Sequence, residues 1–403
     1  MEDKRLDLIA LASIPIMMTL GNSMLIPVLP LIEKEIGITA FQSSLILSIY
    51  SFIAILLIPV SGYLSDIFGR KKIILPGLII VAAGGALAAF AAWKIEEPYV
   101  LILVGRFLQG IGASGAFPVV LPTVGDMFKE EEQVSEGLGV VETANTFGKV
   151  ISPIAGGLLA LVVWFMPFIA VPILSLVSII LVFFFVKVPK NENQQSKQDF
   201  KSFLHCIKDI FHQNGRWLFA IFIIGCFLMF ILFGFLFHFS SMLEDRFHMK
   251  GYMKGLLLAV PLLFLCIASY IGGKKIGSKK PLMKRLILFG SGGASIAFVW
   301  VKDDMALMMF LLLVTIASIG IGLALPCLDA LITEGIEKEE RGSITSLYSS
   351  MRFVGVAAGP PIIALVMKNN SEMIYLILAG VSAAIVVLAL FLINTAKMKK
   401  STS

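Results

Sequence analysis

Two ionisable residues, Glu142 and Lys149, lie inside a long apolar run that extends from Gly137 to Phe165. Their spacing is two turns of an α-helix, so a helix would point both side chains to one face, about 10 Å apart along its axis. That separation is too long for a direct ion pair and suits two groups that line one water-filled path. Ionisable groups inside a bilayer cost about 2.5 kcal/mol or more and usually face a cavity or one another. The spacing therefore predicts that Glu142 carries a proton and that Lys149 influences it.

Each ionisable residue within an apolar run also has a second interpretation. Glu142 is close enough to one end of its run to reach water or to pair with a base in a loop. Lys149 would either compete with the proton and meet an anionic substrate group, or pair with an acid on another helix. Arg106 would take part in proton coupling or organise helix packing by donating to backbone carbonyls. Arg352 would face the same cavity or be structural.

The composition indicates a membrane protein. Of 403 residues, 58% are hydrophobic and only 15% are charged, and the mean hydropathy is +0.92. The apolar residues form blocks of about 20, the length that a helix needs to cross a bilayer. This pattern predicts an all-α polytopic membrane protein with twelve transmembrane helices, and it excludes a barrel of short alternating strands. The predicted spans are 6–28, 41–62, 73–93, 99–121, 137–160, 166–187, 217–239, 253–273, 286–301, 305–328, 343–367 and 373–396.

The distribution of Lys and Arg predicts the orientation. With the N-terminus inside, the cytoplasmic segments hold roughly three times as many of these residues as the external ones. Both termini are therefore expected in the cytoplasm, in a bacterial-type plasma membrane. Lys34 is assigned to an external loop, and Lys254 is counted with the external-loop residues although it lies at the start of the predicted span 253–273. No cleavable signal peptide is expected, and the net charge of +6 belongs to membrane-flanking loops, which gives no reason to expect nucleic acid as a partner.

A polar segment divides the chain into two halves. Residues 1–187 are predicted to form an N-terminal six-helix bundle, and residues 217–403 a C-terminal six-helix bundle. The cytoplasmic linker between them, 188–216, begins with a polar stretch without apolar periodicity. It continues with Phe200 to Phe211, which reads as a short amphipathic helix on the membrane surface.

The two halves repeat a series of features in the same order. Leu121-Pro122, an acidic loop and Gly148-x4-Pro153 in the first half correspond to Leu325-Pro326, an acidic loop and Gly355-x4-Pro360 in the second. Transporters built from parallel repeats have this organisation, with the two copies meeting at a central path.

The most specific motif runs from Gly62 to Lys72, in the sequence Gly-Tyr-Leu-Ser-Asp-Ile-Phe-Gly-Arg-Lys-Lys, and is expected to be a loop between two spans. Its glycines permit a tight reversal, and its acid can bind helix-end amides. The segment resembles the signature loop of the major facilitator superfamily at every main position. The resemblance implies two six-helix bundles that rock around a central site. It also implies that the inner gate is held by the motif residues Gly62, Asp66, Gly69, Arg70 and Lys71.

Two further stretches support this resemblance. Arg106-Phe-Leu-Gln109-Gly-Ile-Gly112 is similar to the fourth-helix motif of the superfamily. The fifth-helix antiporter motif of drug–proton exchangers is matched by Gly148, Pro153, Gly156 and Gly157. In that motif a glycine usually precedes the proline, whereas Ser152 stands there in this chain. The resemblance therefore favours the twelve-span drug:H⁺ antiporters.

The first span departs from the resemblance. Many drug antiporters carry an acid there, whereas this chain offers Asn22. The proton-carrying acid is therefore assigned to Glu142 by elimination, with Lys149 and Arg106 tuning it. Further cavity candidates are polar or basic residues of the spans, namely Asn22, Gln109, Asn145 and Arg352.

These features together predict a proton-coupled efflux antiporter of lipophilic or amphipathic small molecules that works by alternating access. Two alternatives remain open at this point: a dedicated exporter of a metabolite such as a siderophore, and a non-transporting sensor or lipid-interacting protein. No enzyme is expected, because no nucleophile–base pair appears, and neither a cofactor nor a metal site is expected. The expected partners are a small-molecule substrate, protons and the lipid bilayer, and the chain is expected to be a monomer.

Overall fold

The computed structural model describes residues 4–128, 131–186, 200–276, 279–302, 304–336, 338–368 and 372–393. The secondary structure of these residues is α-helical apart from one short 3-10 helix, η2. The elements are α1 (Arg5–Ser23), η2 (Ile26–Val28), α2 (Leu29–Ile36), α3 (Ala40–Phe68), α4 (Arg70–Lys94), α5 (Tyr99–Met127), α6 (Glu131–Val162), α7 (Met166–Phe185), α8 (Phe200–Asp245), α9 (Gly251–Ile276), α10 (Lys280–Trp300), α11 (Leu307–Gly335), α12 (Lys338–Met367) and α13 (Glu372–Leu392).

Twelve helical stretches among the described residues are long and apolar enough to cross a membrane, which confirms the predicted number. The first stretch, Arg5–Ile36, combines α1, η2 and α2. Lys34 therefore lies in a helix, and its assignment to a loop was wrong. The helix continues beyond the apolar block until Gly37, whose φ of 68° ends it in a left-handed conformation that glycine adopts readily.

The linker also differs from the sequence prediction. Most of its polar part, 187–199, lies outside the described residues. From Phe200 onward the chain forms the start of α8, which continues to Asp245 in one helix of 46 residues. The predicted short helix is therefore not separate from the seventh span. Between Phe200 and the apolar block there is no proline, and Gly215 alone costs only about 1 kcal/mol in a helix.

The chain divides into two compact units. The first comprises Met1–Phe200 with Ser240–Leu256, and the second Lys201–Phe239 with Leu257–Ser403. The end of α8 and the start of α9 therefore pack with the first unit, although they follow the linker in sequence. The predicted bundle boundaries at 187 and 217 remain a prediction.

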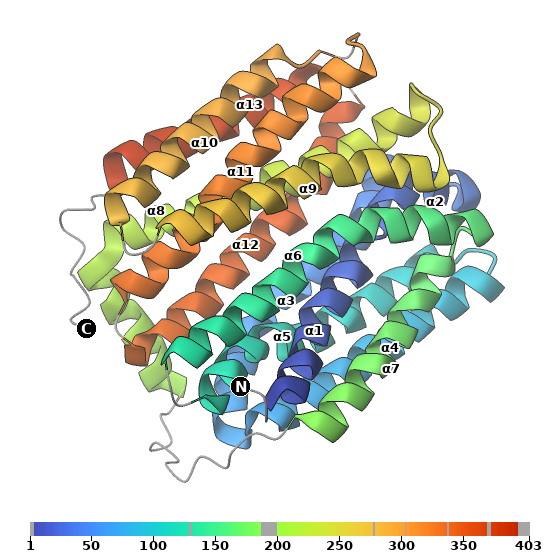
Figure 1. Ribbon diagram of the computed structural model, residues 1–403. Coiled ribbons are helices and arrows are strands. Elements are labelled where there is room, and N and C mark those ends of the chain that lie inside the picture. The colour runs from blue at the N-terminus through green and yellow to red at the C-terminus, as the bar shows by residue number, and fades with distance from the viewer. Residues whose placement is uncertain are drawn as a thin grey trace. The chain divides into compact units, whose positions relative to one another are not determined.

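In the first unit the helices approach one another through glycines. A Cβ atom on Gly84 of α4 would lie 2.5 Å from the carbonyl oxygen of Gly105 on α5, and one on Gly112 would lie 2.3 Å from that of Gly77. α1 packs along α6 in the same unit (Figure 1). Small residues allow such close backbone contact between membrane helices.

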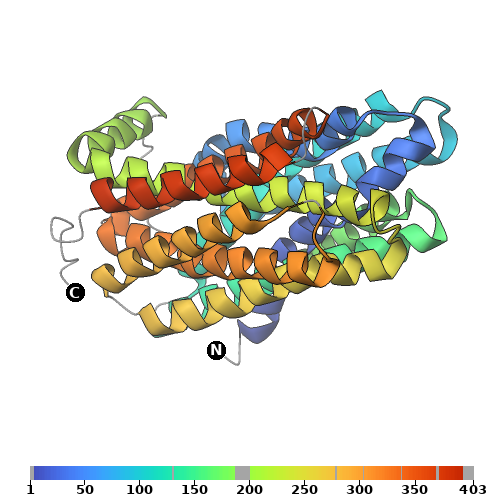
Figure 2. The ribbon, with the colours of Figure 1, turned by 90° about the horizontal axis from the view of Figure 1, so that it is seen from above.

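The second unit repeats this packing. α10 lies beside both α11 and α13 (Figure 2). Gly290 and Gly320 bring α10 and α11 together, because a Cβ atom on either residue would lie within 2.5 Å of the other's carbonyl oxygen. The glycine-mediated pair α4–α5 thus has a counterpart in α10–α11.

A lysine contact is also repeated in both units. Lys71 at the start of α4 donates from Nζ to the carbonyl oxygens of Phe183 and Val186, each at 2.8 Å, where α7 ends. Near the start of α10, Lys284 donates to the carbonyl oxygens of Leu390 and Ile393, at 2.9 and 2.7 Å, where α13 ends. Each lysine therefore satisfies helix-end carbonyls that lack an intrahelical donor. The acceptors are three residues apart in both units, so the repeat extends to individual hydrogen bonds.

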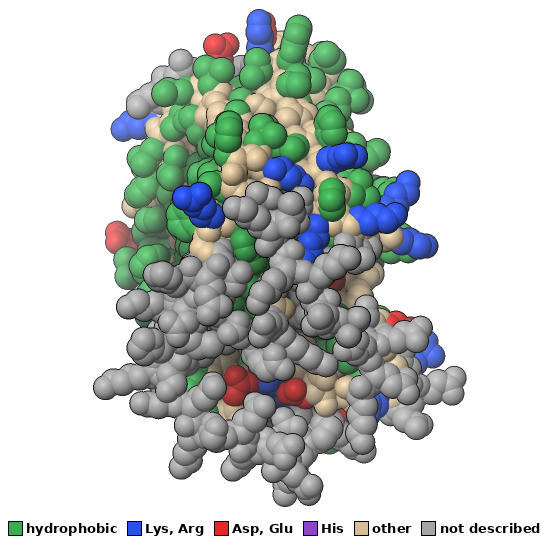
Figure 3. Space-filling model, turned by 90° about the vertical axis from the view of Figure 1, so that its left-hand side faces the viewer, with side chains coloured by type: hydrophobic (Ala, Val, Ile, Leu, Met, Phe, Trp, Pro, Cys, Tyr) green, Lys and Arg blue, Asp and Glu red, His purple; other side chains and the backbone are tan. Residues whose placement is uncertain are grey.

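Large apolar side chains are exposed on many helices. The space-filling view shows apolar side chains over much of one face, with Lys and Arg side chains among them (Figure 3). Soluble monomers rarely expose extensive apolar surface, whereas helices in lipid must do so. The most exposed examples include Trp93, Phe184, Phe289, Trp300, Met308 and Phe391.

Candidate transport site

Arg106 lies at the centre of the first unit, with only 1% of its surface exposed. Its Nε donates to the carbonyl oxygen of Ile46 at 2.8 Å, and one terminal nitrogen donates to that of Gly21 at 3.4 Å. The same terminal nitrogen binds Oε1 of Gln109, and the other binds Oδ1 of Asn22. The guanidinium group thus connects α1, α3 and α5, which is the packing arrangement considered for this residue from the sequence.

Within the described structure, the guanidinium group of Arg106 is surrounded by neutral hydrogen-bond acceptors and an aromatic ring. Its hydrogen-bond partners there are carbonyl and amide oxygens, and the ring of Tyr50 lies 4.7 Å from its Cζ atom. Asn22 and Gln109 therefore serve as ligands of Arg106. Among the described residues, the buried Nε2 atom of Gln109 has no hydrogen-bond partner, so both N–H groups of this amide remain unused there.

Glu142 and Lys149 lie on α6, as predicted, and differ in exposure. The Glu142 side chain is exposed on the surface of the unit, and Lys149 is partly buried. Asn145, which is buried, places Nδ2 3.4 Å from both carboxylate oxygens of Glu142. Its Oδ1 accepts a 2.7 Å hydrogen bond from Thr19 on α1. Asn145 thus links the helix that carries Glu142 to α1.

Gly156 and Gly157 of α6 lie against the backbone of neighbouring segments. A Cβ atom on Gly156 would lie 2.0 Å from the carbonyl oxygen of Met24. A Cβ atom on Gly157 would lie 2.4 Å from the carbonyl oxygen of Gly251, at the start of α9. Any side chain at either position would therefore push backbone segments apart.

Pro153 and Gly148 complete the predicted fifth-helix motif. Pro153 lies inside α6, and its carbonyl oxygen would be 2.3 Å from a Cβ atom on Gly255 of α9. At Gly148 the nearest contact for an added Cβ would be Cβ of Thr19, at 3.2 Å. The four motif residues therefore pack α6 against α1, against Met24 at the end of α1, and against the start of α9.

The signature segment is more helical than predicted. α3 continues through Gly62 and Asp66 to Phe68, and α4 begins at Arg70. The break between them is Gly69, with φ 97° and ψ 143°, a conformation that only glycine adopts without strain. Asp66 was therefore wrongly placed in a loop, because a single glycine suffices for the reversal.

Arg70 contacts three polar side chains. It forms an ion pair with Asp66, four residues earlier in the chain, and its Nε donates to Oδ2 of Asp126 at 2.9 Å. It also donates to Oγ of Ser65 at 2.7 Å. The sequence analysis had not predicted the pairing of Asp126 with Arg70. All four residues belong to the first unit, and the role of Asp66 and Arg70 in an inner gate remains a prediction.

Arg352 belongs to the second unit and lies on α12. Its terminal nitrogen is 3.6 Å from Oδ1 of Asp329 on α11. Its Cζ atom is 5.7 Å from the ring centroid of Tyr348. These contacts fit a structural role, and its predicted place in a cavity stays a prediction.

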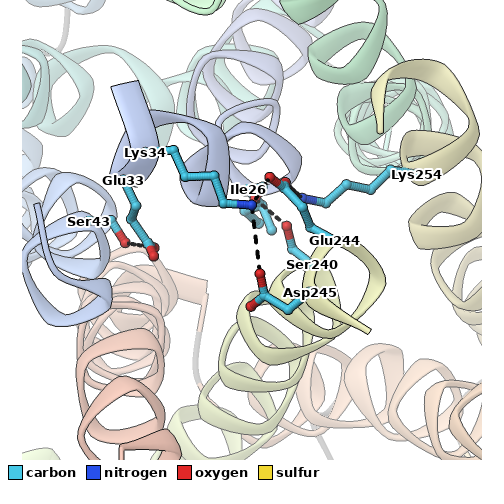
Figure 4. Close-up of polar contacts among 8 residues, drawn as sticks. All are labelled: Ile26, Glu33, Lys34, Ser43, Ser240, Glu244, Asp245 and Lys254. Carbon is cyan, nitrogen blue, oxygen red and sulfur yellow. Dashed lines mark hydrogen bonds and ion pairs between the residues drawn. The ribbon is translucent and has the colours of Figure 1, made fainter. Parts of the chain in front are cut away.

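The sequence did not predict a buried ion cluster in the first unit. Lys254, assigned to a loop, lies in α9 and is 1% exposed, so that assignment was wrong. It pairs with Glu244, which also contacts Lys34 (Figure 4). The predicted seventh span ends at residue 239 with the apolar block, whereas α8 continues to Asp245. Glu244 was therefore not recognised as a residue of this helix.

Comparison with known proteins agrees with this architecture. The family model of the Major Facilitator Superfamily matches residues 11–360 and 275–403. The bacillibactin exporter of Bacillus subtilis (strain 168) is 50% identical over 395 residues, with 98% of each chain covered. The class C tetracycline resistance protein of Escherichia coli is 24% identical over 370 residues, with 87% of each chain covered.

A similar solved structure is the crystal structure of the human organic anion transporter MFSD10 (TETRAN). Its TM-score is 0.72 at 18% identity, with 96% of this chain and 99% of that chain covered. At that identity the likeness concerns the fold alone. The family match and the 50% identical relative show in addition that the chain is a transporter rather than an enzyme. This multi-pass bacterial membrane protein belongs to the Major Facilitator Superfamily.

Proposed function

We propose that this chain exports bacillibactin or a closely similar siderophore in exchange for protons. The observation that carries the proposal is the 50% identity to a bacillibactin exporter across 98% of both chains. The siderophore exporter was one of the alternatives left open by the sequence. Basic side chains within the spans, among them Lys149, would suit a ligand with anionic groups.

Multidrug export is the second candidate, because the tetracycline resistance protein aligns along most of the chain. Its identity is 24%, less than half that of the bacillibactin exporter. The comparison therefore favours one preferred substrate over a broad range. The non-transporting alternative has no support among these relatives, which are all named as transport or resistance proteins.

We assign the coupling proton to Glu142. Its carboxylate is exposed on the surface of the unit, within a span from Glu136 to Val162. An ionised carboxylate facing lipid would be costly, so this position suits a face that borders water. The neighbouring amide of Asn145 and the cation of Lys149 would then shift the balance between the protonated and ionised forms.

The proposal also includes the arrangement in the cell. Lys and Arg are more frequent in the connecting segments on the same side of the membrane as the termini, which supports cytoplasmic termini. The chain would work as a monomer in the lipid bilayer. Its substrate site would open alternately to one side of the membrane and to the other.

The test uses proteoliposomes with an acidic lumen, in which proton efflux should drive substrate uptake. Wild type should accumulate iron-free bacillibactin only while the pH gradient lasts, and should transport tetracycline weakly. Glu142→Gln should lose accumulation driven by the gradient while it still exchanges substrate between the two sides. Glu136→Gln, on the same helix and also exposed, is the matched control and should behave as wild type.

Each part of the proposal can fail separately. Undiminished gradient-driven accumulation by Glu142→Gln would show that another group carries the proton. Transport of tetracycline but not bacillibactin would favour the multidrug candidate. Transport that ignores the gradient in wild type would exclude proton coupling.

A further inference from the structure

A buried carboxylate and two ammonium groups join three segments of the first unit. Glu244, near the end of α8, has a side chain that is 4% exposed, and that of Lys254, in α9, is 2% exposed. Nζ of Lys254 lies 2.9 Å from Oε2 of Glu244, and Nζ of Lys34 in α2 lies 2.8 Å from Oε1. Each carboxylate oxygen thus binds a different lysine, as Figure 4 shows. We call these three residues the ion clasp.

The ion clasp is buried at Glu244 and Lys254 and exposed at Lys34. Lys34 is 56% exposed and also approaches Oδ1 of Asp245 at 3.8 Å, and Asp245 is 66% exposed. About one turn before Glu244 on α8, the buried Ser240 donates to the carbonyl oxygen of Ile26 at 2.8 Å. The segment Ser240–Leu256 is therefore tied to η2 by a neutral hydrogen bond and to α2 by an ion pair.

This segment also contacts α6 at two glycines. Gly255 meets the backbone of Pro153, and Gly251 meets the backbone of Gly157 and the side chain of Leu161. These are van der Waals contacts, which have no preferred direction. The ion pair of Glu244 with Lys34 and the hydrogen bond of Ser240 are directional contacts that hold the segment to α2 and η2.

A buried ion pair is a poor way to gain stability. The cost of removing both charges from water offsets much of their attraction, and apolar residues of similar volume often stabilise a protein equally well. The charges do, however, regain hydration when the segment opens to water. An ion clasp therefore suits a contact that must hold in one state and release in another.

We propose that Glu244, Lys254 and Lys34 form a releasable clasp at the end of the spans opposite the N-terminus, and that it opens to let cargo leave. The inference rests on the proposed export function, in which that end faces the outside. Glu244 is the central residue, because its single carboxylate binds both lysines. Lys254 is the buried partner, and Lys34 is the partner that water can reach.

The test measures opening directly. All four cysteines are replaced by serine, and Ser240→Cys supplies one reporter thiol. Ser240 is 1% exposed, so a membrane-impermeant maleimide added outside intact cells should label it only when the segment moves. No substrate is needed, so the result stands whether or not the chain exports bacillibactin, and failure of either proposal can be recognised separately.

Two variants in this background decide the matter. Glu244→Gln leaves the ammonium group of Lys254 buried without its carboxylate, and the labelling rate should rise roughly tenfold or more. Asp245→Asn removes the neighbouring, exposed carboxylate, and the rate should stay within about twofold of the parent. The double variant Glu244→Gln/Lys254→Gln has no unpaired buried charge and should label more slowly than Glu244→Gln.

An unchanged labelling rate in Glu244→Gln, or an equal rise in Asp245→Asn, would overturn the proposal. If Glu244→Gln does not reach the membrane, the double variant replaces it, and its labelling must then exceed that of the parent. Failure of both variants to reach the membrane would make the cluster a folding element and would also overturn the proposal.

Discussion

Replacing Gly156 by alanine should separate α6 from Met24, the residue that follows α1. The new Cβ atom would lie 2.0 Å from the carbonyl oxygen of Met24 and 2.8 Å from its carbonyl carbon. Both are backbone atoms, so no side-chain rotation can relieve the contact. Non-bonded atoms pack best at about 3.5 Å or more, so the backbones must separate by roughly 1.5 Å. Overpacking typically costs 1–3 kcal/mol, and here we expect about 3 kcal/mol.

The measurement is thermal unfolding of purified protein in detergent, for a series of alanine variants along α6. Gly139 has nothing within 4 Å of an added Cβ, and Gly148 has Cβ of Thr19 at 3.2 Å. Gly139→Ala should be neutral or stabilising, by about 0.4–1 kcal/mol, because alanine restricts the unfolded chain. Gly148→Ala should fall between Gly139→Ala and Gly156→Ala, and transport should decline in the same order.

The series would refute the reasoning if Gly156→Ala unfolded at the same temperature as Gly139→Ala. Stability would then not depend on the distance between α6 and Met24. Destabilisation of Gly139→Ala by the same amount would also count against it, since that loss would reflect α6 in general rather than one contact.

Two further predictions concern hydrogen bonds of basic residues. Arg106→Lys keeps the charge, but an ammonium group cannot reproduce the planar set of bonds to Ile46 and Asn22; we expect a loss of at least about 1.5–3 kcal/mol, the worth of one charge-assisted bond, measured by thermal unfolding. Wild-type stability in that variant would show that the charge alone suffices. Lys71→Met and Lys284→Met each remove two bonds to helix-end carbonyls, and should each destabilise by about 1 kcal/mol in the same assay. A large loss in one and none in the other would contradict the equivalence of the two lysines.

Much of the fold follows from the sequence, because lipid imposes a simple pattern. Apolar blocks of the length of a bilayer gave the correct number of spans. The motif from Gly148 to Gly157, which the sequence analysis singled out, lies where α6 packs closely against its neighbours. The alternative considered for Arg106, donation to backbone carbonyls, agrees with its bonds to Ile46 and Gly21. Burial of a cation among helices leaves few other acceptors, so this contact could be anticipated from the residue type.

The ion clasp could not be anticipated in the same way. Hydropathy marks where apolar residues stop, whereas a helix stops where its hydrogen bonds do. α8 therefore carries Glu244 beyond the apolar block. Which face of a helix end is buried depends on its neighbours. The partner of Lys34 lies more than 200 positions away, and no local pattern connects the two residues.

The first unit contains Ser240–Leu256, a stretch that lies beyond the linker. During synthesis, the helices that precede the linker would emerge from the ribosome without the residues that cover Gly157 and neutralise Lys34. The unit can therefore be completed only after the chain has been translated past Leu256. A polypeptide that ended before the linker would lack one of its own packing surfaces, and a separately expressed second fragment would carry the missing piece.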